Sequence, residues 1–179
     1  MSVGADDIID DAVTDAKLSL ESVFTVWIES LGADNLSRIL FKRNTISFDP
    51  SIIVSHNGSF RKTAVAASGN NVYVVYRENI TEPPASDAIW YRRSTDGGAS
   101  FGGAMNLRIT TTGNTFEPSL AASGNNVYVL WSNDVDPGGF DILYKKSTNG
   151  GASFGDTKIL SNTTGNSGRP DIAASNNLT

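Results

Sequence analysis

The sequence predicts an all-β protein built from repeated four-stranded antiparallel units. Three observations point to this class. Charged residues make up only 18% of the 179 residues, short apolar runs alternate with turns rich in Gly, Ser, Thr and Asn, and long stretches recur almost unchanged. Helix is expected to be a minor feature, and the length suits one domain with a sizeable core.

The repeat is the most informative of these observations. "AASGNNVYVVY" (66–76) returns as "AASGNNVYVLW" (121–131), and "RRSTDGGASFGG" (92–103) returns as "KKSTNGGASFGD" (145–156). "RPDIAAS" (169–175) begins another copy, and the period is in the low fifties. Self-similarity at such a period is typical of solenoids and propellers.

A degenerate copy precedes the two clear ones. "KLSLESVFTVWIES" (17–30) matches the "AAS…VYVLW" segment, and "RILFKRN" (38–44) matches "AIWYRRS" (88–94). This copy lacks the Gly-Gly loop, because the chain runs straight from Asn44 into "TISF".

Each unit carries four short strand signals joined by short turns, as in an antiparallel meander. In the best-defined unit we expect strands at about 118–123, 126–132, 140–147 and 157–161. The first is built from small residues such as Ala121, as expected of an innermost strand crowded around a central axis. A sheet of about 50 residues that cannot bury both its faces alone is the unit of a β-propeller.

The predicted organisation is an acidic N-terminal segment followed by propeller blades. The segments are 1–16 (acidic), then blades at about 17–54, 63–109 and 118–161 within a repeat region of 17–179, and an extra first strand at 170–175. Three blades do not close a ring, since propellers have four to eight. We therefore expect an incomplete or open propeller that is either a piece of a longer propeller or a protomer that completes its ring with a second copy. The isolated chain is then expected to be dimeric or prone to aggregate.

The Gly-rich loop between the third and fourth strands has the chemistry of a tight turn. Asp96 can accept hydrogen bonds from nearby backbone N–H groups, and Gly97 and Gly98 tolerate positive φ. Phe101 and Phe154, three residues after the second Gly, are expected to fold back as apolar plugs. A phosphate-binding loop is disfavoured because no helix or Lys follows the glycines.

"STDGGASF" resembles the Asp-box of the sialidase and bacterial-neuraminidase repeat, Ser/Thr-x-Asp-x-Gly-x-x-Trp/Phe. The matching positions are Ser94, Asp96, Gly98 and Phe101 in one copy and Ser147, Asn149, Gly151 and Phe154 in the next. Asn149 keeps a side-chain acceptor but lacks the charge. The resemblance implies a six-bladed propeller in which the box is a structural corner on the outer rim, away from the active site.

The resemblance also suggests where a ligand would bind. Sialidases hold a substrate carboxylate with three Arg, the first of them in a Tyr/Phe-Arg-Ile-Pro stretch before the first strand of a blade. This chain has "FRKT" there, with Arg61 but no Pro, and "GRPD" with Arg169 in a later copy, while Glu117 stands at the equivalent place between them. These three residues are the candidate ligand contacts, expected at the mouth of the central funnel.

The remaining catalytic parts of a sialidase are not evident. The family uses a Tyr–Glu pair and an Asp, but Tyr73 and Tyr128 occupy the same repeat position, as do Tyr91 and Tyr144. A residue repeated in successive blades is more simply a packing choice than a nucleophile. No catalytic residue is assigned on this basis.

Several function classes are disfavoured by composition. The chain has no Cys and one His, His56, so a thiolate or His-based metal site and a Ser-His-Asp triad are not expected, and we expect no cofactor. Calcium binding by Asp96 is disfavoured, because the next copy has the uncharged Asn149 at the same position. The net charge of −5 argues against a nucleic-acid partner, and no apolar run is long enough to span a membrane.

The sequence favours a non-catalytic binding or structural module of Asp-box blades, displayed outside or on the surface of a prokaryotic cell, that engages a glycan or a protein. Two alternatives remain open: a fragment of a sialidase-like exo-glycosidase, and a surface-layer or filament spacer. If the protein is an enzyme, the resemblance implies a sialidase-like glycoside hydrolase.

Overall fold

The computed structural model describes residues 23–31, 36–44, 52–55, 59–80, 86–108, 114–134, 139–161 and 164–175. Within these ranges the chain forms three antiparallel sheets and no helix. The acidic segment 1–16, the expected first strand of the first unit and His56 lie outside the described residues. None of the described residues belongs to a helix that could cross a membrane.

The three sheets follow one another along the sequence, and we call them blades 1, 2 and 3. Blade 1 contains β1 (Val23–Ser30), β2 (Ser37–Asn44) and β3 (Ile52–Ile53); blade 2 contains β4 (Phe60–Ser68), β5 (Asn71–Ile80), β6 (Ser86–Ser94) and β7 (Met105–Asn106); blade 3 contains β8 (Thr115–Ser123), β9 (Asn126–Asp134), β10 (Phe140–Ser147) and β11 (Lys158–Ile159). Blades 2 and 3 are the four-stranded meanders that the sequence predicts. Their last strands are only two residues long.

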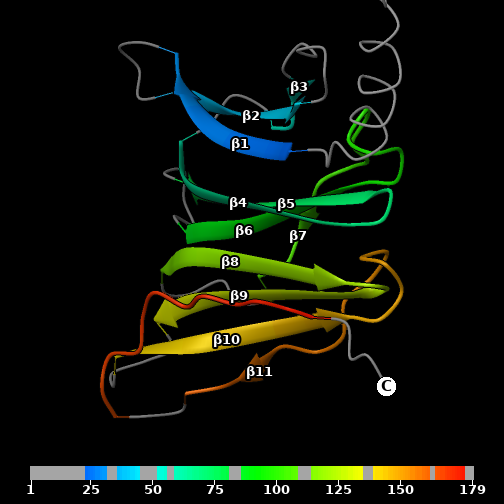
Figure 1. Ribbon diagram of the computed structural model, residues 1–179. Helices are drawn as coiled ribbons and strands as arrows, with labels where there is room; N and C mark the ends of the chain where they lie inside the picture. Colours follow the sequence, from blue (N-terminus) through cyan, green and yellow to red (C-terminus); the bar gives the residue numbers. More distant parts are fainter. Residues whose placement is uncertain are drawn as a thin grey trace, which may run out of the picture.

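The blades stack face to face, with the first strands of blades 2 and 3 in contact with each other (Figure 1). Each interface between two adjacent blades is called a seam here. Because side chains alternate along a strand, those of β5 are divided between the two seams on either side of blade 2. Val72 and Val74 face the core shared with blade 1, whereas Tyr73 and Val75 face the core shared with blade 3. A sheet apolar on both faces is stable only between two neighbours, as the sequence pattern indicates.

Both clear repeats begin with the same hairpin. Gly69 and Gly124 hold the left-handed conformation, with φ of 57° and 55°, in the two-residue turns that join the first and second strands. Further along the same strands the register shifts between Phe60 and Lys62 in blade 2 and between Phe116 and Ser119 in blade 3. These bulges lie where the first strand of each blade begins.

The C-terminal segment 164–175 lies across blade 3 without forming a strand ladder, although a first strand was expected at 170–175 (Figure 1). The Ser167 N–H donates to the Phe140 carbonyl at 2.6 Å, and the Ser119 hydroxyl lies 3.2 Å from a carboxylate oxygen of Asp171. These two contacts hold the segment against blade 3, beside its first strand, which is the place that the repeat assigns to it.

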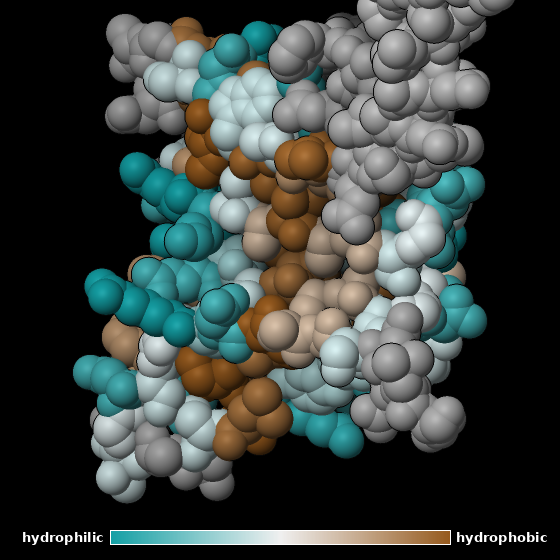
Figure 2. All heavy atoms as spheres, in the orientation of Figure 1, coloured by the Kyte–Doolittle hydropathy of each residue, from teal (hydrophilic) through white to brown (hydrophobic). Residues whose placement is uncertain are grey.

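An apolar band runs across the blades on the side that carries β4 and β8 (Figure 2). The first strands of the blades are rich in small and branched residues, as in "TAVAAS" (63–68) and "SLAAS" (119–123). In a propeller the innermost strands surround the central axis. The band therefore marks the inner side of an arc of blades.

Candidate functional site

The Asp-box of blade 2 is a turn closed by its own side chains. The Ser94 hydroxyl accepts a hydrogen bond from the Gly98 N–H at 2.8 Å and donates to Asp96 Oδ1 at 2.6 Å. Asp96 Oδ1 also accepts from the Ser100 N–H at 2.9 Å. These bonds from Ser100 and Ser94 hold the pKa of the Asp96 carboxyl well below its usual range, so it is ionised at neutral pH.

The box of blade 3 makes the same bonds without a charge. Ser147 accepts from the Gly151 N–H at 2.9 Å and donates to Asn149 Oδ1 at 2.8 Å, and that oxygen accepts from the Ser153 N–H at 3.1 Å. The amide of Asn149 donates to the Ser153 hydroxyl at 2.8 Å. The turn therefore needs an oxygen acceptor at this position and does not need a carboxylate.

Each box is also the place where a blade touches the one before it. Arg93 of blade 2 donates to the Gly150 carbonyl at 3.0 Å, and the Tyr91 hydroxyl donates to the Gly151 carbonyl at 3.1 Å. At the seam between blades 1 and 2, Arg43 donates to the Gly97 carbonyl at 3.2 Å. The boxes thus link adjacent blades through backbone carbonyls.

The box phenylalanines pack on the preceding blade and not only on their own. Phe101 meets Phe41 edge-to-face with ring centroids 4.9 Å apart, and Phe154 meets Tyr91 in the same way at 4.9 Å. The glycines leave no room for a side chain there: a Cβ on Gly98 would lie 2.7 Å from the Phe41 ring, and one on Gly151 would lie 1.9 Å from the Tyr91 hydroxyl. Glycine is thus required both for positive φ and for close approach.

The candidate ligand residues lie at the other end of the sheets. Ser94, where the box begins, pairs with Val72 near the start of β5, whereas Phe60, beside Arg61, pairs with Glu78 near the end of β5. Arg61 is exposed within the bulge of β4. The boxes and the candidate ligand face are therefore separated by the length of a strand, as the resemblance implies.

The structure brings Glu117 and Arg169 together. Glu117 Oε1 lies 3.8 Å from Arg169 Nε, and the Arg169 side chain is 90% exposed, so this is a long and weak ion pair. Both residues precede a proline and adopt positive φ, 49° and 58°. A non-glycine residue in this region carries about 1–3 kcal/mol of strain and persists only where its surroundings hold it, which is common at functional sites. Among the described residues no ion pair joins Arg61 to Glu117, although β4 and β8 are neighbours.

Sequence reasoning missed the residues that support this bulge. The guanidinium of Arg77 lies 4.5 Å from the centre of the Phe116 ring, next to Glu117, and also pairs with Asp87 at 2.6 Å. Asp87 is almost fully buried, so blade 2 holds the bulge of blade 3 with a buried ion pair and a cation–π contact. The available signal was a pair of opposite charges, Arg77 and Asp87, on two neighbouring strands of one predicted meander.

The repeated tyrosines of blade 2 lie in the seam. Tyr73 and Tyr91 are buried between blades 2 and 3, with ring centroids 6.2 Å apart. Burial raises the pKa of both phenols, which opposes formation of a phenolate nucleophile. Both are packing residues by their surroundings.

At the box end, two hollows open on the surface of the described residues. One, of about 400 Å³, is lined by Tyr91, Arg93 and the box of blade 2, together with Gly151 and Ala152 of blade 3. The other, of about 380 Å³, lies on blade 3 beside Tyr144 and Lys146. Neither includes Arg61, Glu117 or Arg169. Among the described residues no group of three or more His, Cys, Asp or Glu side chains could hold a metal ion.

The sequence matches no family model and no curated protein. Among solved structures, an alpha-L-arabinanase from Penicillium chrysogenum complexed with arabinobiose aligns with a TM-score of 0.54 and 10% identity over 78% of this chain and 45% of the arabinanase. A variant of the NanB sialidase from Streptococcus pneumoniae aligns with a TM-score of 0.45 and 11% identity over 70% of this chain and 19% of the sialidase. This chain spans less than half the length of either protein. The likeness to the arabinanase, with the three stacked sheets, confirms the predicted all-β fold as an open array of β-propeller blades.

Proposed function

We propose that the protein is a non-catalytic module that binds a glycan through the face formed by Arg61, Glu117 and Arg169. The observation that carries this is the pairing of Glu117, in the bulge of β8, with Arg169 of the C-terminal segment. Both residues have positive φ, and the Arg169 side chain is 90% exposed. Guanidinium and carboxylate groups are suited to sugar hydroxyls and, for Arg, to sugar carboxylates. The likeness to a glycosidase fold agrees with a glycan ligand but does not identify it.

Binding without hydrolysis is favoured by the state of the tyrosines. Hydrolysis of a glycosidic bond generally needs two acidic groups on either side of the bond, or a tyrosine nucleophile in the sialidase pattern. Tyr73 and Tyr91 are sealed in a seam and their pKa values are raised. Asp87, another carboxylate at this end of blade 2, is engaged by Arg77.

A glycan array followed by calorimetry tests the proposal. We expect binding that falls at least about tenfold in Arg61→Ala and Arg169→Ala, the loss of about 1.4 kcal/mol expected of a charge-assisted contact. Lys62→Ala is the matched control, because it removes an exposed positive charge next to Arg61 outside the proposed contacts. Equal loss in the control would mean that charge alone attracts the ligand.

The same samples distinguish the alternatives. Turnover of a fluorogenic sialoside or arabinoside that depends on Arg61 would replace the binding module by a sialidase-like or related exo-glycosidase. Silence on the array together with self-assembly of the chain would favour a surface-layer or filament spacer.

The location is part of the proposal. A glycan-binding face is useful where glycans are displayed, and we place the protein outside or at the surface of a prokaryotic cell. Protease treatment of intact cells checks this, because a surface protein is digested while an internal one is protected.

A further inference from the structure

The face of blade 2 that meets blade 3 forms a binding surface for the Asp-box turn of blade 3, which we call the receptor. Its Tyr73 and Tyr91 rings lie nearly parallel, 19° apart with centroids 6.2 Å apart, and Leu107 completes the surface with 2% exposure. The turn of the blade 3 box rests on it, with Arg93 donating to the Gly150 carbonyl.

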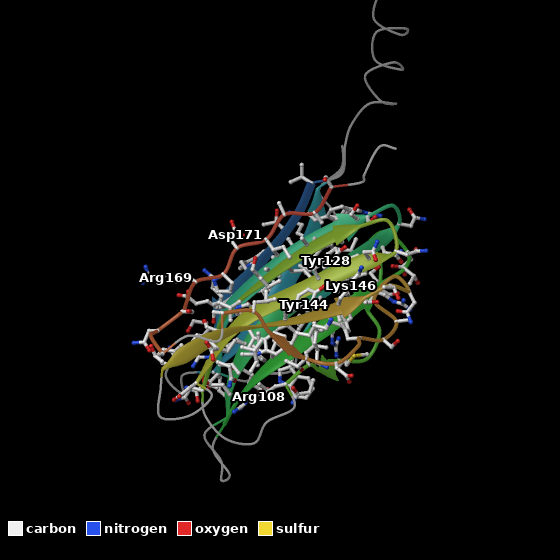
Figure 3. The ribbon with its side chains drawn as sticks, turned by 90° about the horizontal axis from the view of Figure 1, so that it is seen from below. Arg108, Tyr128, Tyr144, Lys146, Arg169 and Asp171 are labelled. Atoms are coloured by element: carbon white, nitrogen blue, oxygen red, sulfur yellow. The ribbon has the colours of Figure 1, made fainter. Side chains whose placement is uncertain are left out.

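Blade 3 repeats this receptor on the face turned away from blade 2, against which the described residues place no further blade. Tyr128 and Tyr144, the repeat equivalents of Tyr73 and Tyr91, have centroids 6.3 Å apart and the same 19° between rings (Figure 3). The Leu160 N–H donates to Ile142 at 2.8 Å just as Leu107 donates to Ile89. Leu160, however, is 56% exposed.

The cations at the two receptors also differ, since Arg93 on blade 2 donates to the next blade and Lys146 on blade 3 contacts a ring of its own blade. Lys146 is the repeat equivalent of Arg93, but its ammonium lies 5.4 Å from the centre of the Tyr128 ring on its own blade (Figure 3). The hollow beside it is lined by blade 3 residues alone, whereas the equivalent hollow on blade 2 is partly formed by Gly151 and Ala152 of the next blade. The receptor on blade 3 therefore has the same paired tyrosines and a cation at the same place as the receptor on blade 2. Among the described residues, no box turn lies against it.

The C-terminal segment indicates what would supply that turn. "RPDIAAS" (169–175) repeats the start of blade 3, and it lies beside blade 3 through Asp171 on Ser119 and Arg169 near Glu117. A blade that continued from this segment would bring its box over Tyr144, as the box of blade 3 lies over Tyr91.

We propose that the outer face of blade 3 is the docking surface for a fourth Asp-box blade continuing from residues 169–175. The two glycines of its box lie on Tyr144, a carbonyl of the turn accepts from Lys146, and its phenylalanine packs edge-to-face on the Tyr144 ring. This surface is separate from the glycan face, at the opposite end of the sheets, and the proposal does not depend on that function.

Thiol reactivity tests it, because the chain contains no cysteine. Lys146→Cys places one thiol at the exposed receptor of blade 3. Arg93→Cys places one thiol at the receptor of blade 2, which the box of blade 3 covers. An extended chain is made by joining a copy of residues 124–161 after Ser175, the repeat equivalent of Ser123. Circular dichroism of every variant checks that the blades are folded.

In the 179-residue chain we expect Cys at position 146 to react with a thiol reagent freely and Cys at position 93 to react slowly. In the extended chain the reaction at 146 slows by about tenfold or more, because labelling then requires local opening of a seam. Valine in place of the glycine that corresponds to Gly151 in the added copy should restore fast reaction at 146, since a Cβ there cannot be accommodated.

Three outcomes would overturn the proposal. Equal reactivity at 146 in the two chains would show that the added blade does not dock there. Unchanged protection in the valine variant would show that the box is not the docked element. Protection at 146 in the 179-residue chain that rises with protein concentration would make a second copy the occupant.

Discussion

The two Asp-boxes form the same turn from different side chains, and the comparison separates what the turn needs from what the seam needs. Asp96 and Asn149 accept the same backbone N–H bond, so the turn needs an oxygen. Beneath the glycines, Phe41 offers only a ring in one seam, whereas Tyr91 adds a hydroxyl bond in the other. The hydrogen bonds of the turn are therefore the same in both boxes, whereas the contacts across each seam depend on which ring the preceding blade supplies.

The largest effect is expected where the glycine meets its partner. Gly151→Ala and Gly98→Ala should each lower the free energy of unfolding by about 2–4 kcal/mol, combining left-handed strain with overpacking. Gly151→Ala should cost more, because its Cβ would lie 1.9 Å from the Tyr91 hydroxyl. Chemical denaturation measures both.

Gly69→Ala is the control for the glycine variants. Gly69 has a φ of 57° but nothing within 4 Å of a Cβ, so alanine there carries only the backbone strain, about 1 kcal/mol. If all three substitutions cost the same, the seam contacts contribute nothing and the boxes act only on their own turns.

The next largest effect is a loss of stability at alkaline pH, to which a buried tyrosine in each seam contributes. Burial raises the pKa of Tyr76, in the seam of blades 1 and 2, to about 12, and it raises that of Tyr91 in the other seam. A raised pKa means that the folded state holds the proton more tightly, so stability is complete below about pH 10 and falls as the pH rises to about 12, by about 2–3 kcal/mol for Tyr76.

Tyr76→Phe and Tyr91→Phe assign this loss to a seam. Each substitution should flatten the alkaline fall in melting temperature, and Tyr91→Phe should also cost about 1 kcal/mol at neutral pH through the lost bond to Gly151. An alkaline profile identical to that of the parent in both variants would contradict the assignment.

A smaller effect separates the two boxes at acid pH. The pKa of Asp96 is lowered in the fold by its bonds from Ser100 and Ser94, so its contribution is complete above about pH 4 and is lost as the pH falls further. We expect Asp96→Asn to reduce the acid sensitivity of the melting temperature and Asn149→Asp to increase it. Unchanged acid sensitivity in both variants would show that a carboxylate at this position does not contribute to stability through these hydrogen bonds.

The smallest effect is expected at the other end of the blades. Arg61→Ala and Arg169→Ala should change the free energy of unfolding by no more than about 0.5 kcal/mol, since both side chains are exposed. A thermal melt checks this, and a large loss for either would mean that the residue serves the fold and not a ligand.

The repeat explains why so much of the fold could be predicted. The third strand of blade 3 was expected at 140–147 and spans Phe140–Ser147, because alternating side chains and flanking turns define it locally. The expected first strand at 118–123 begins earlier, at Thr115, since the bulge at Glu117 lets the ladder continue past an interruption that Pro118 makes in the sequence.

The site was less predictable because its contacts cross between blades. Glu117 and Arg169 could be placed at equivalent repeat positions, but their pairing depends on the C-terminal segment lying back on blade 3. The contact of Arg77 with Phe116 joins residues of two different blades, so the pattern within either strand does not predict it. The seam role of the boxes was missed for the same reason: Arg93 and Gly150 are neighbours only after stacking.

The hairpin that opens both clear repeats has a consequence for how the chain reaches its fold. "SGNNVYV" occurs at 68–74 and again at 123–129, so β4 could pair in register with β9 as well as with β5. The correct partner is two residues away, across the turn at Gly69, and the wrong one is on the far side of a long loop whose closure costs more entropy. Local hairpins form within microseconds. The tight glycine turn thus lets each first strand pair within its own blade before a competing strand that shares the residues "NVYV" can reach it.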